Sequence, residues 1–225
     1  MRPDFVTVDM EYADRMLPSI CSISIVSWKD NEIIDVFSSL INPDCEIESF
    51  LKDRHGITDD MVKSAPSLPK LWPDICKILE GNIVFMHSAA HAFSSLLVRA
   101  DVDYLTLPNL NYGCTLSLAR RVWPGLSDYR LPEVTEHLGI TKLHNHSLED
   151  AKSVGVIVTK AMKEKNAKNV VDLFNKVGFA GGMIKDNKKQ IYRAVKDKKE
   201  KVFLCRVEEN FFNISDFYKI AKAQD

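Results

Sequence analysis

Near the N-terminus the sequence reads Phe5-Val-Thr-Val-Asp-Met-Glu-Tyr12, an apolar, β-branched run that ends in two carboxylates one residue apart. Because side chains alternate along a strand, we expect Asp9 and Glu11 to project from the same face near the strand's end. Two acids aimed into one cleft repel each other unless a cation lies between them, and hard oxygen ligands suit Mg²⁺ or Mn²⁺. The run therefore predicts a metal site, with two solvated acids at a strand end as the alternative.

The composition is that of an ordinary folded domain. The chain has 225 residues, of which 45% are hydrophobic and 27% are charged, which is enough for one sizeable core with a small appendage. No apolar run reaches membrane-spanning length and the charged N-terminus does not lead into a signal peptide, so we expect a cytoplasmic protein without membrane contact. The 5 cysteines are scattered and match neither a disulfide framework nor a zinc pattern.

Charge is distributed unevenly along the chain. From Lys165 onward 14 Lys and Arg residues stand against 8 Asp and Glu, and since the whole chain carries −1, the preceding residues carry −7. The densest basic run is 185–201, and its members Lys188, Lys189 and Arg193 are expected to contact the phosphate backbone of a nucleic acid. A solvated helix face is the alternative for this run.

Periodicity predicts the order of the elements. Alternating β-branched residues indicate three strands joined by short links, which predicts an antiparallel meander over 5–9, 20–28 and 33–41. Further strands are expected over 82–87, 110–114 and 201–207. Helical spacing predicts helices over 67–79, 89–99, 116–122, 131–138, 147–163, 169–177 and 216–223. This order predicts an α/β protein with a mixed sheet and helices on its faces.

Five segments occur in the order found in one family: Asp9-Met-Glu11, His55-Gly-Ile-Thr58, Cys114-Thr-Leu-Ser-Leu-Ala-Arg120 with Trp123-Pro124, Arg130-Leu131 to Leu138-Gly-Ile140, and Leu148-Glu-Asp-Ala151. Together they resemble the DnaQ-like 3′→5′ exonucleases of the DEDDh type, the group of the DNA polymerase III epsilon subunit, whose fold is ribonuclease H-like. The resemblance covers about residues 4–163. It implies an exonuclease-like domain over 1–164, followed by a small basic C-terminal extension over 165–225.

The family's chemistry implies roles for particular residues. Two divalent ions clamp the scissile phosphate, while a histidine removes a proton from the attacking water. By resemblance, Asp9, Glu11 and Asp150 are the catalytic ligands of Mg²⁺ or Mn²⁺, and the substrate is a nucleic acid with a single-stranded 3′ end. We assign Tyr12 and His87, at the ends of their strands, to substrate binding.

Two positions depart from the family pattern. The segment His87-Ser-Ala-Ala-His-Ala-Phe93 places Ala92 where the family has an aspartate, and counting back from Asp150 places Asn145 where the family has its histidine. Neither side chain can ionise. Loss of a carboxylate weakens the second ion, and loss of a positioned base costs ~10²–10⁴-fold in rate, so we expect weak or lost activity.

The histidines beside Asn145 keep other interpretations open. His144 or His146 is a candidate displaced base, with solvated loop histidines as the alternative. The function therefore stays divided between a slow or rewired exonuclease and a non-catalytic pseudo-exonuclease that binds nucleic acid or a protein partner. A metal-dependent hydrolase of small nucleotides is a third interpretation.

Overall fold

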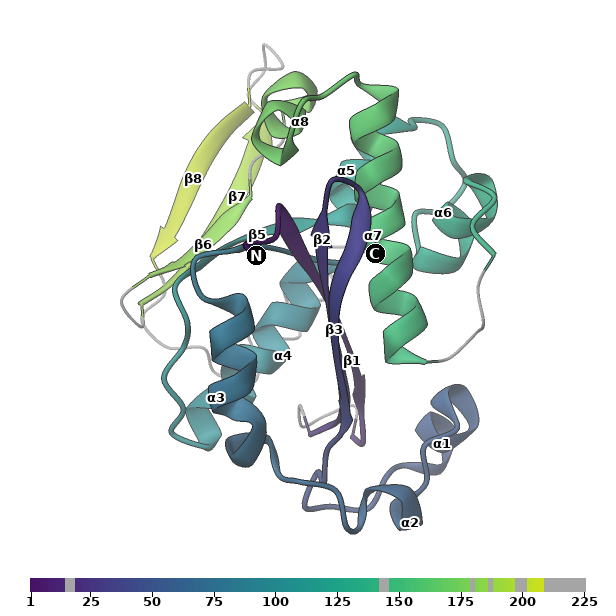
Figure 1. Ribbon diagram of the computed structural model, residues 1–225, viewed down its shortest axis with the longest axis vertical. Coiled ribbons are helices and arrows are strands. Elements are labelled where there is room, and N and C mark those ends of the chain that lie inside the picture. Colours follow the sequence, from purple (N-terminus) through teal and green to yellow (C-terminus); the bar gives the residue numbers. More distant parts are fainter. Residues whose placement is uncertain (15–18, 142–145, 179–180, 186–187, 197–201, 209–225) are drawn as a thin grey trace.

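The computed structural model describes residues 1–14, 19–141, 146–178, 181–185, 188–196 and 202–208. Its centre is one mixed sheet in the order β3-β2-β1-β4-β5-β6-β7-β8 (Figure 1). β4 lies parallel to β1 and β5 parallel to β4, and the other neighbours are antiparallel. The strands are β1 (Phe5–Tyr12), β2 (Ile20–Lys29), β3 (Glu32–Leu40), β4 (Ile83–Met86), β5 (Leu110–Cys114), β6 (Gly182–Lys185), β7 (Lys188–Lys196) and β8 (Val202–Glu208).

The first three strands form the predicted antiparallel meander. β2 and β3 are joined through Asp30 and Asn31, whose φ angles of 52° and 66° lie in the left-handed region that Asp and Asn tolerate better than most residues. β2 is buried from Ile20 to Trp28 because elements cover it on both faces. The meander therefore places β1, with its two acids, inside the sheet between β2 and β4.

Helices cover both faces of the sheet (Figure 1). One apolar core joins the sheet to α3 and α4, a second joins it to α5, α6, α7 and α8, and a smaller third core joins it to α1 and α2. The described residues contain no helix that is long and apolar enough to cross a membrane. The helices are α1 (Ser49–His55), α2 (Asp59–Val62), α3 (Leu68–Leu79), α4 (Ala89–Val102), α5 (Thr115–Val122), α6 (Leu131–His137), α7 (Ser147–Glu164) and α8 (Val170–Val177).

Residues Lys188–Lys196, the middle of the basic run near the C-terminus, form a strand. β6 pairs with β5, and β7 and β8 continue the sheet in antiparallel register, so Lys188, Lys189 and Arg193 lie on β7. The helix-face alternative for this run is wrong, because its backbone pairs across strands and not within a helix. The strand expected over 201–207 is present as β8, and the helix expected over 216–223 lies outside the described residues.

The segment after residue 164 also contributes to the cores of the domain. Leu173 of α8 is fully buried in the core of α7, and Ile184 of β6 is buried in the core of α3 and α4. The division into a domain over 1–164 and an extension over 165–225 stays a prediction.

Candidate metal and active site

Three carboxylates converge at one end of β1. Asp9 and Glu11 come from β1 and Asp150 from the start of α7, and one carboxylate oxygen of each lies within 4.8 Å of the other two. All three residues are half-buried. The structure thus brings together the acids that the sequence predicted to converge. A set of oxygen donors only fits a hard cation such as Mg²⁺ or Mn²⁺.

A β-bulge lies beside Glu11. Glu11 lies opposite Ser22, but Tyr12 lies opposite Ile20, so β2 has one extra residue at Cys21. Bulges bend a strand and redirect the side chains next to them, and they are frequent near active sites. Here the bulge marks the point where the carboxylate end of β1 leaves regular pairing with β2.

The start of α7 directs Asp150 toward β1. His146 is the N-cap residue, and its carbonyl accepts a hydrogen bond of 3.1 Å from the amide of Asp150. The neighbouring Glu149 forms an ion pair of 2.8 Å with Lys152 on the same helix. Of the two acids in this first turn, Asp150 is therefore the one that joins the carboxylate cluster, and the helix dipole favours a negative charge at this position.

Tyr12 packs toward α4. Its ring lies edge-on to the ring of His91, with the centroids 6.1 Å apart. Burial is the main reason why the pKa of the Tyr12 hydroxyl is raised; the nearby charges of Asp9 and Glu11 raise it further, while the neighbouring hydroxyl of Ser95 lowers it. Tyr12 therefore stays a neutral phenol that anchors the end of β1 on α4, and its assignment to substrate binding stays a prediction.

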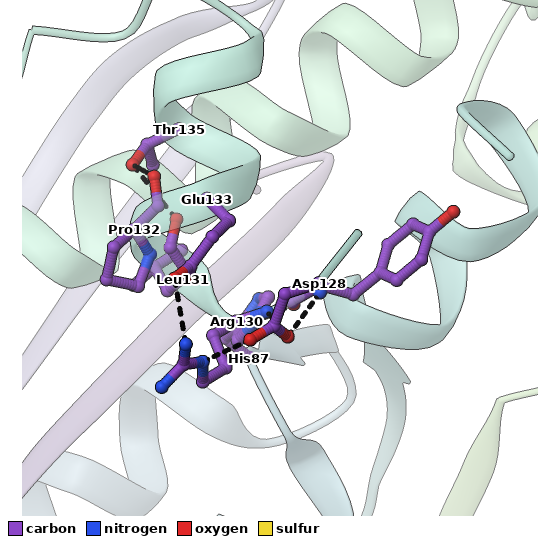
Figure 2. Close-up of polar contacts among 8 residues, drawn as sticks. His87, Asp128, Arg130, Leu131, Pro132, Glu133 and Thr135 are labelled. Carbon is purple, nitrogen blue, oxygen red and sulfur yellow. Dashed lines mark hydrogen bonds and ion pairs between the residues drawn. The ribbon is translucent and has the colours of Figure 1, made fainter. Parts of the chain in front are cut away.

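His87, which follows β4, is held at both ring nitrogens. Nε2 donates to the carbonyl of Tyr129 at 2.9 Å, and Nδ1 lies 3.0 Å from Oγ1 of Thr115. These two contacts, which the sequence did not reveal, fix the segment before α6 over the end of β4. Figure 2 shows that Arg130, in this segment, pairs with Asp128 and Glu133. The substrate-binding role of His87 stays a prediction.

The remaining predicted site residues either are not members of the carboxylate cluster or lie outside the described residues. Ala92 lies in α4, half-buried against the core, and its methyl group offers no ligand atom. His146 is exposed at the start of α7. His144 and Asn145 lie outside the described residues. β7, with Lys188, Lys189 and Arg193, is separated from β1 by three strands, which corresponds to about 19 Å at ~4.8 Å per strand.

Buried hydroxyl groups lie beside the carboxylates. Ser22 and Ser24 of β2 face Ser147 of α7, and none of the three is among the predicted site residues. The signal was the alternation of these serines with Ile23 and Ile25, which is typical of one apolar and one polar face.

Residues 7–155 match the exonuclease (RNase_T) family, and this match includes all three clustered acids. The chain belongs to this exonuclease family. Its relatives include the DNA polymerase III PolC-type protein of Caldanaerobacter subterraneus, 30% identical over 164 residues, which are 72% of this chain and 12% of that protein. The exonuclease domain described here thus spans only a small part of this relative.

A shorter relative is covered over most of its length. The DNA polymerase III subunit epsilon of Aquifex aeolicus is 28% identical over 172 residues, which are 71% of this chain and 81% of that protein. Among solved structures, the nuclease domain of 3′hExo, a DEDDh family member bound to rAMP, shares the fold with a TM-score of 0.64 at 17% identity, over 72% of this chain and 93% of that one. The predicted family and its ribonuclease H-like fold are confirmed.

Proposed function

We propose that this exonuclease-family domain binds Mg²⁺ or Mn²⁺ through Asp9, Glu11 and Asp150, and that it hydrolyses the 3′ end of a single-stranded nucleic acid slowly. The observation that supports the proposal most directly is the convergence of the three carboxylate oxygens within 4.8 Å. Family membership supports the reaction class, since metal-carboxylate sites act on phosphodiesters by positioning and electrostatics.

The donor set accounts for how an ion would be held. Asp9 and Glu11 would bind it from a central strand and Asp150 from a helix, and both elements hold side chains more firmly than a loop does. When bound, the ion supplies Lewis-acid chemistry, which polarises a phosphoryl oxygen and activates water. Three carboxylates carry −3, so one divalent ion leaves −1, which still repels a phosphodiester. Productive binding therefore needs a second cation or basic side chains.

The surroundings of the cluster favour slow chemistry. The carboxylate cluster, within the described part of the chain, includes no histidine, and Ala92 offers no fourth carboxylate for a second ion. A positioned general base contributes ~10²–10⁴-fold to the rate. His146, exposed at the start of α7, is the described candidate for a displaced base.

A non-catalytic module that binds nucleic acid is the second candidate function. The half-buried methyl group of Ala92 favours it, because Ala92 supplies no carboxylate from α4 for a second ion. Both ring nitrogens of His87 are engaged by Thr115 and Tyr129, so this histidine is occupied with holding the segment before α6.

End-labelled oligonucleotides separate these functions. Single-stranded DNA and RNA labelled at the 5′ end are incubated with the protein and Mn²⁺ or Mg²⁺. We expect a ladder of labelled products that are progressively shorter at the 3′ end. These products should be absent with Asp150→Asn or with a chelator. If Asp150→Asn shortens the strand as fast as the wild type, the proposal is contradicted, because cleavage then does not depend on the carboxylate cluster. A strand that is bound but never shortened favours the non-catalytic module.

A further inference from the structure

Four serine hydroxyls form a chain between α7 and the meander; Ser22, Ser24 and Ser147 are buried, and Ser38 is exposed. Ser147, the first residue of α7, has its Oγ 2.8 Å from Oγ of Ser22 and 2.7 Å from Oγ of Ser24. Oγ of Ser24 lies in turn 2.9 Å from Oγ of Ser38 on β3. Ser147 is thus the member that joins the helix to β2, and Ser38 is at the end of the chain that points away from the helix.

The strand register places this chain beside the carboxylates. Ser24 lies opposite Asp9 and Ser22 opposite Glu11 in the antiparallel pair of β1 and β2. Directly opposite residues share a face of the sheet, so the two serines stand in the row next to the two acids. Asp150 follows Ser147 by three residues, and residues three apart are neighbours on a helix surface.

The rest of α7 is attached to the sheet by different means. One turn later, Oγ1 of Thr7 donates to the carbonyl of Ala151 at 2.7 Å. A further turn on, Gly155 lies against Trp28, where a Cβ atom would be 2.1 Å from the indole. These contacts fix the second and third turns of the helix. In the first turn, which carries Asp150, the hydrogen bonds of Ser147 perform the equivalent attachment.

We propose that Ser147 is a positioning residue of the metal site: held by Ser22 and Ser24, it fixes the first turn of α7 so that Asp150 stays beside Asp9 and Glu11. The inference rests on the proposed function, because it concerns how the same carboxylates are oriented for an ion. Groups that orient metal ligands without touching the ion typically contribute ~10–100-fold to its affinity.

The test is the affinity of the full chain for Mn²⁺, measured by calorimetry or by the loss of the free-ion electron paramagnetic resonance signal. Ser147→Ala is expected to weaken binding by ~10-fold or more. Ser38→Ala, which removes a hydroxyl of the same chain that does not touch α7, is the matched control and should leave the affinity unchanged. Equal affinities of the wild type and Ser147→Ala overturn the inference while leaving the proposed function intact.

A second variant separates positioning from general stability. Ser147→Ala leaves the buried hydroxyls of Ser22 and Ser24 with fewer hydrogen-bond partners, which lowers the free energy of unfolding. Replacing Ser22, Ser24 and Ser147 together by alanine removes these hydroxyls as well, so the free energy of unfolding should recover toward that of the wild type. Mn²⁺ affinity should nevertheless stay low, because the first turn of α7 is no longer held by hydrogen bonds. An affinity that returns together with stability overturns the inference. If the wild type binds no Mn²⁺ at all, the proposed function fails, and the positioning role fails with it.

Discussion

Gly155 of α7 packs against the indole of Trp28 in β2 so closely that a Cβ atom on residue 155 would lie 2.1 Å from Cε2 of the indole. The indole is itself fixed, because it is buried and its Nε1 donates to Oγ1 of Thr7 at 3.1 Å. Thr7 donates to the carbonyl of Ala151 at 2.7 Å. The position of the helix that carries Asp150 therefore depends on the absence of a side chain at residue 155.

We predict that Gly155→Ala destabilises the protein. In an unhindered helix this substitution stabilises by about 1 kcal/mol, because alanine is the better helix former. Here the added methyl group must displace Trp28 or the helix, and such overpacking costs about 1–3 kcal/mol. Urea unfolding should show a lower midpoint. Lys160→Ala, at an exposed position of the same helix, is the control and should change stability by no more than ~0.5 kcal/mol. A raised midpoint for Gly155→Ala would mean that the helix can move away.

His55 makes stability depend on pH. It is 2% exposed, Nδ1 accepts from the amide of Ile57 at 3.1 Å, and Nε2 lies 3.1 Å from the carbonyl of Tyr12. Burial, as the main cause, holds the pKa of His55 below its ordinary value of 6.5, although the contact with Tyr12 raises it. The pKa of His55 is thus lower in the folded state than in the unfolded state. At pH values between these two pKa values, the unfolded state binds more protons than the folded state. Stability is therefore fully present above the unfolded value and falls as the pH drops toward the folded value.

We predict that His55→Gln flattens this dependence. The wild type should lose unfolding free energy from about pH 7 to about pH 5, the range in which an ordinary histidine becomes charged, and the variant should lose less. The measurement is urea unfolding at a series of pH values. His137→Gln, at an exposed position on α6, is the matched control and should keep the slope of the wild type. Parallel curves for the wild type and His55→Gln would show that another group causes the dependence.

The local pattern of apolar and polar residues was sufficient to predict most of the fold. Alternation predicted the meander and helical spacing predicted α7, because both elements expose one face and bury the other. The basic strand β7 was not predicted, since its apolar residues come as the adjacent pairs Ile191-Tyr192 and Ala194-Val195 and do not alternate with polar ones. Its state is set by backbone pairing with β6 and β8, which is a contact between segments and leaves no local pattern.

The candidate site divides in the same way. Asp9 and Glu11 were found by strand alternation alone, but Asp150 was found only by resemblance, because an acid in the first turn of a helix is ordinary. The chain of hydrogen-bonded serines could be identified only from the structure. Ser24 and Ser147 are 123 residues apart, and their contact of 2.7 Å follows from how α7 packs on β2. A contact of this kind depends on tertiary packing, and the sequence showed only that Ser22 and Ser24 alternate with isoleucines.

We predict that a divalent ion stabilises the wild type and not Asp150→Asn. A ligand that binds only the folded state at 100 times its dissociation constant adds about 2.7 kcal/mol, so Mn²⁺ should raise the melting temperature. Without the ion, Asp150→Asn should be at least as stable as the wild type, because it removes a mutual repulsion among three acids. The control is Glu149→Gln, which alters the acid paired with Lys152 and should respond to Mn²⁺ like the wild type. An equal response of Asp150→Asn would place the ion elsewhere.

We predict that β7 contributes non-specific affinity for nucleic acid. Residues before Lys165 carry a net charge of −7, so this part of the chain repels a polyanion. The surplus of positive charge lies in the residues from Lys165 onward. Replacing Lys188, Lys189 and Arg193 by glutamine should weaken binding to single-stranded oligonucleotides of any sequence. It should also reduce the salt slope by up to about 2, at ~0.7 for each neutralised phosphate.

A control with the same change in charge tests this assignment. Replacing Lys63, Lys70 and Lys77 by glutamine removes three exposed positive charges from other parts of the chain. If net charge alone matters, both triple variants will lose affinity equally, and the β7 assignment fails. If β7 contacts phosphates, its variant will lose affinity while the control stays close to the wild type.

We predict that Ala92→Asp together with Asn145→His raises cleavage by orders of magnitude. The aspartate would supply a carboxylate from α4 for a second ion, and the histidine would supply a base worth ~10²–10⁴-fold. A fourth acid beside three others adds repulsion, so without an ion the double variant should be less stable and should gain more from Mn²⁺ than the wild type. The measurement is the rate at which a 5′-labelled single strand shortens in Mn²⁺.

The control adds Asp150→Asn to the double variant, which should abolish the gain because the new groups act only with a bound ion. If the rate stays flat although Mn²⁺ still stabilises the double variant, the ion site is restored but the strand is not held productively, and the non-catalytic module is favoured. If the unmodified protein already cleaves well, His146→Ala and His144→Ala decide whether a neighbouring histidine acts as the base. Loss of cleavage in either one assigns the displaced base and removes the need for Asn145→His.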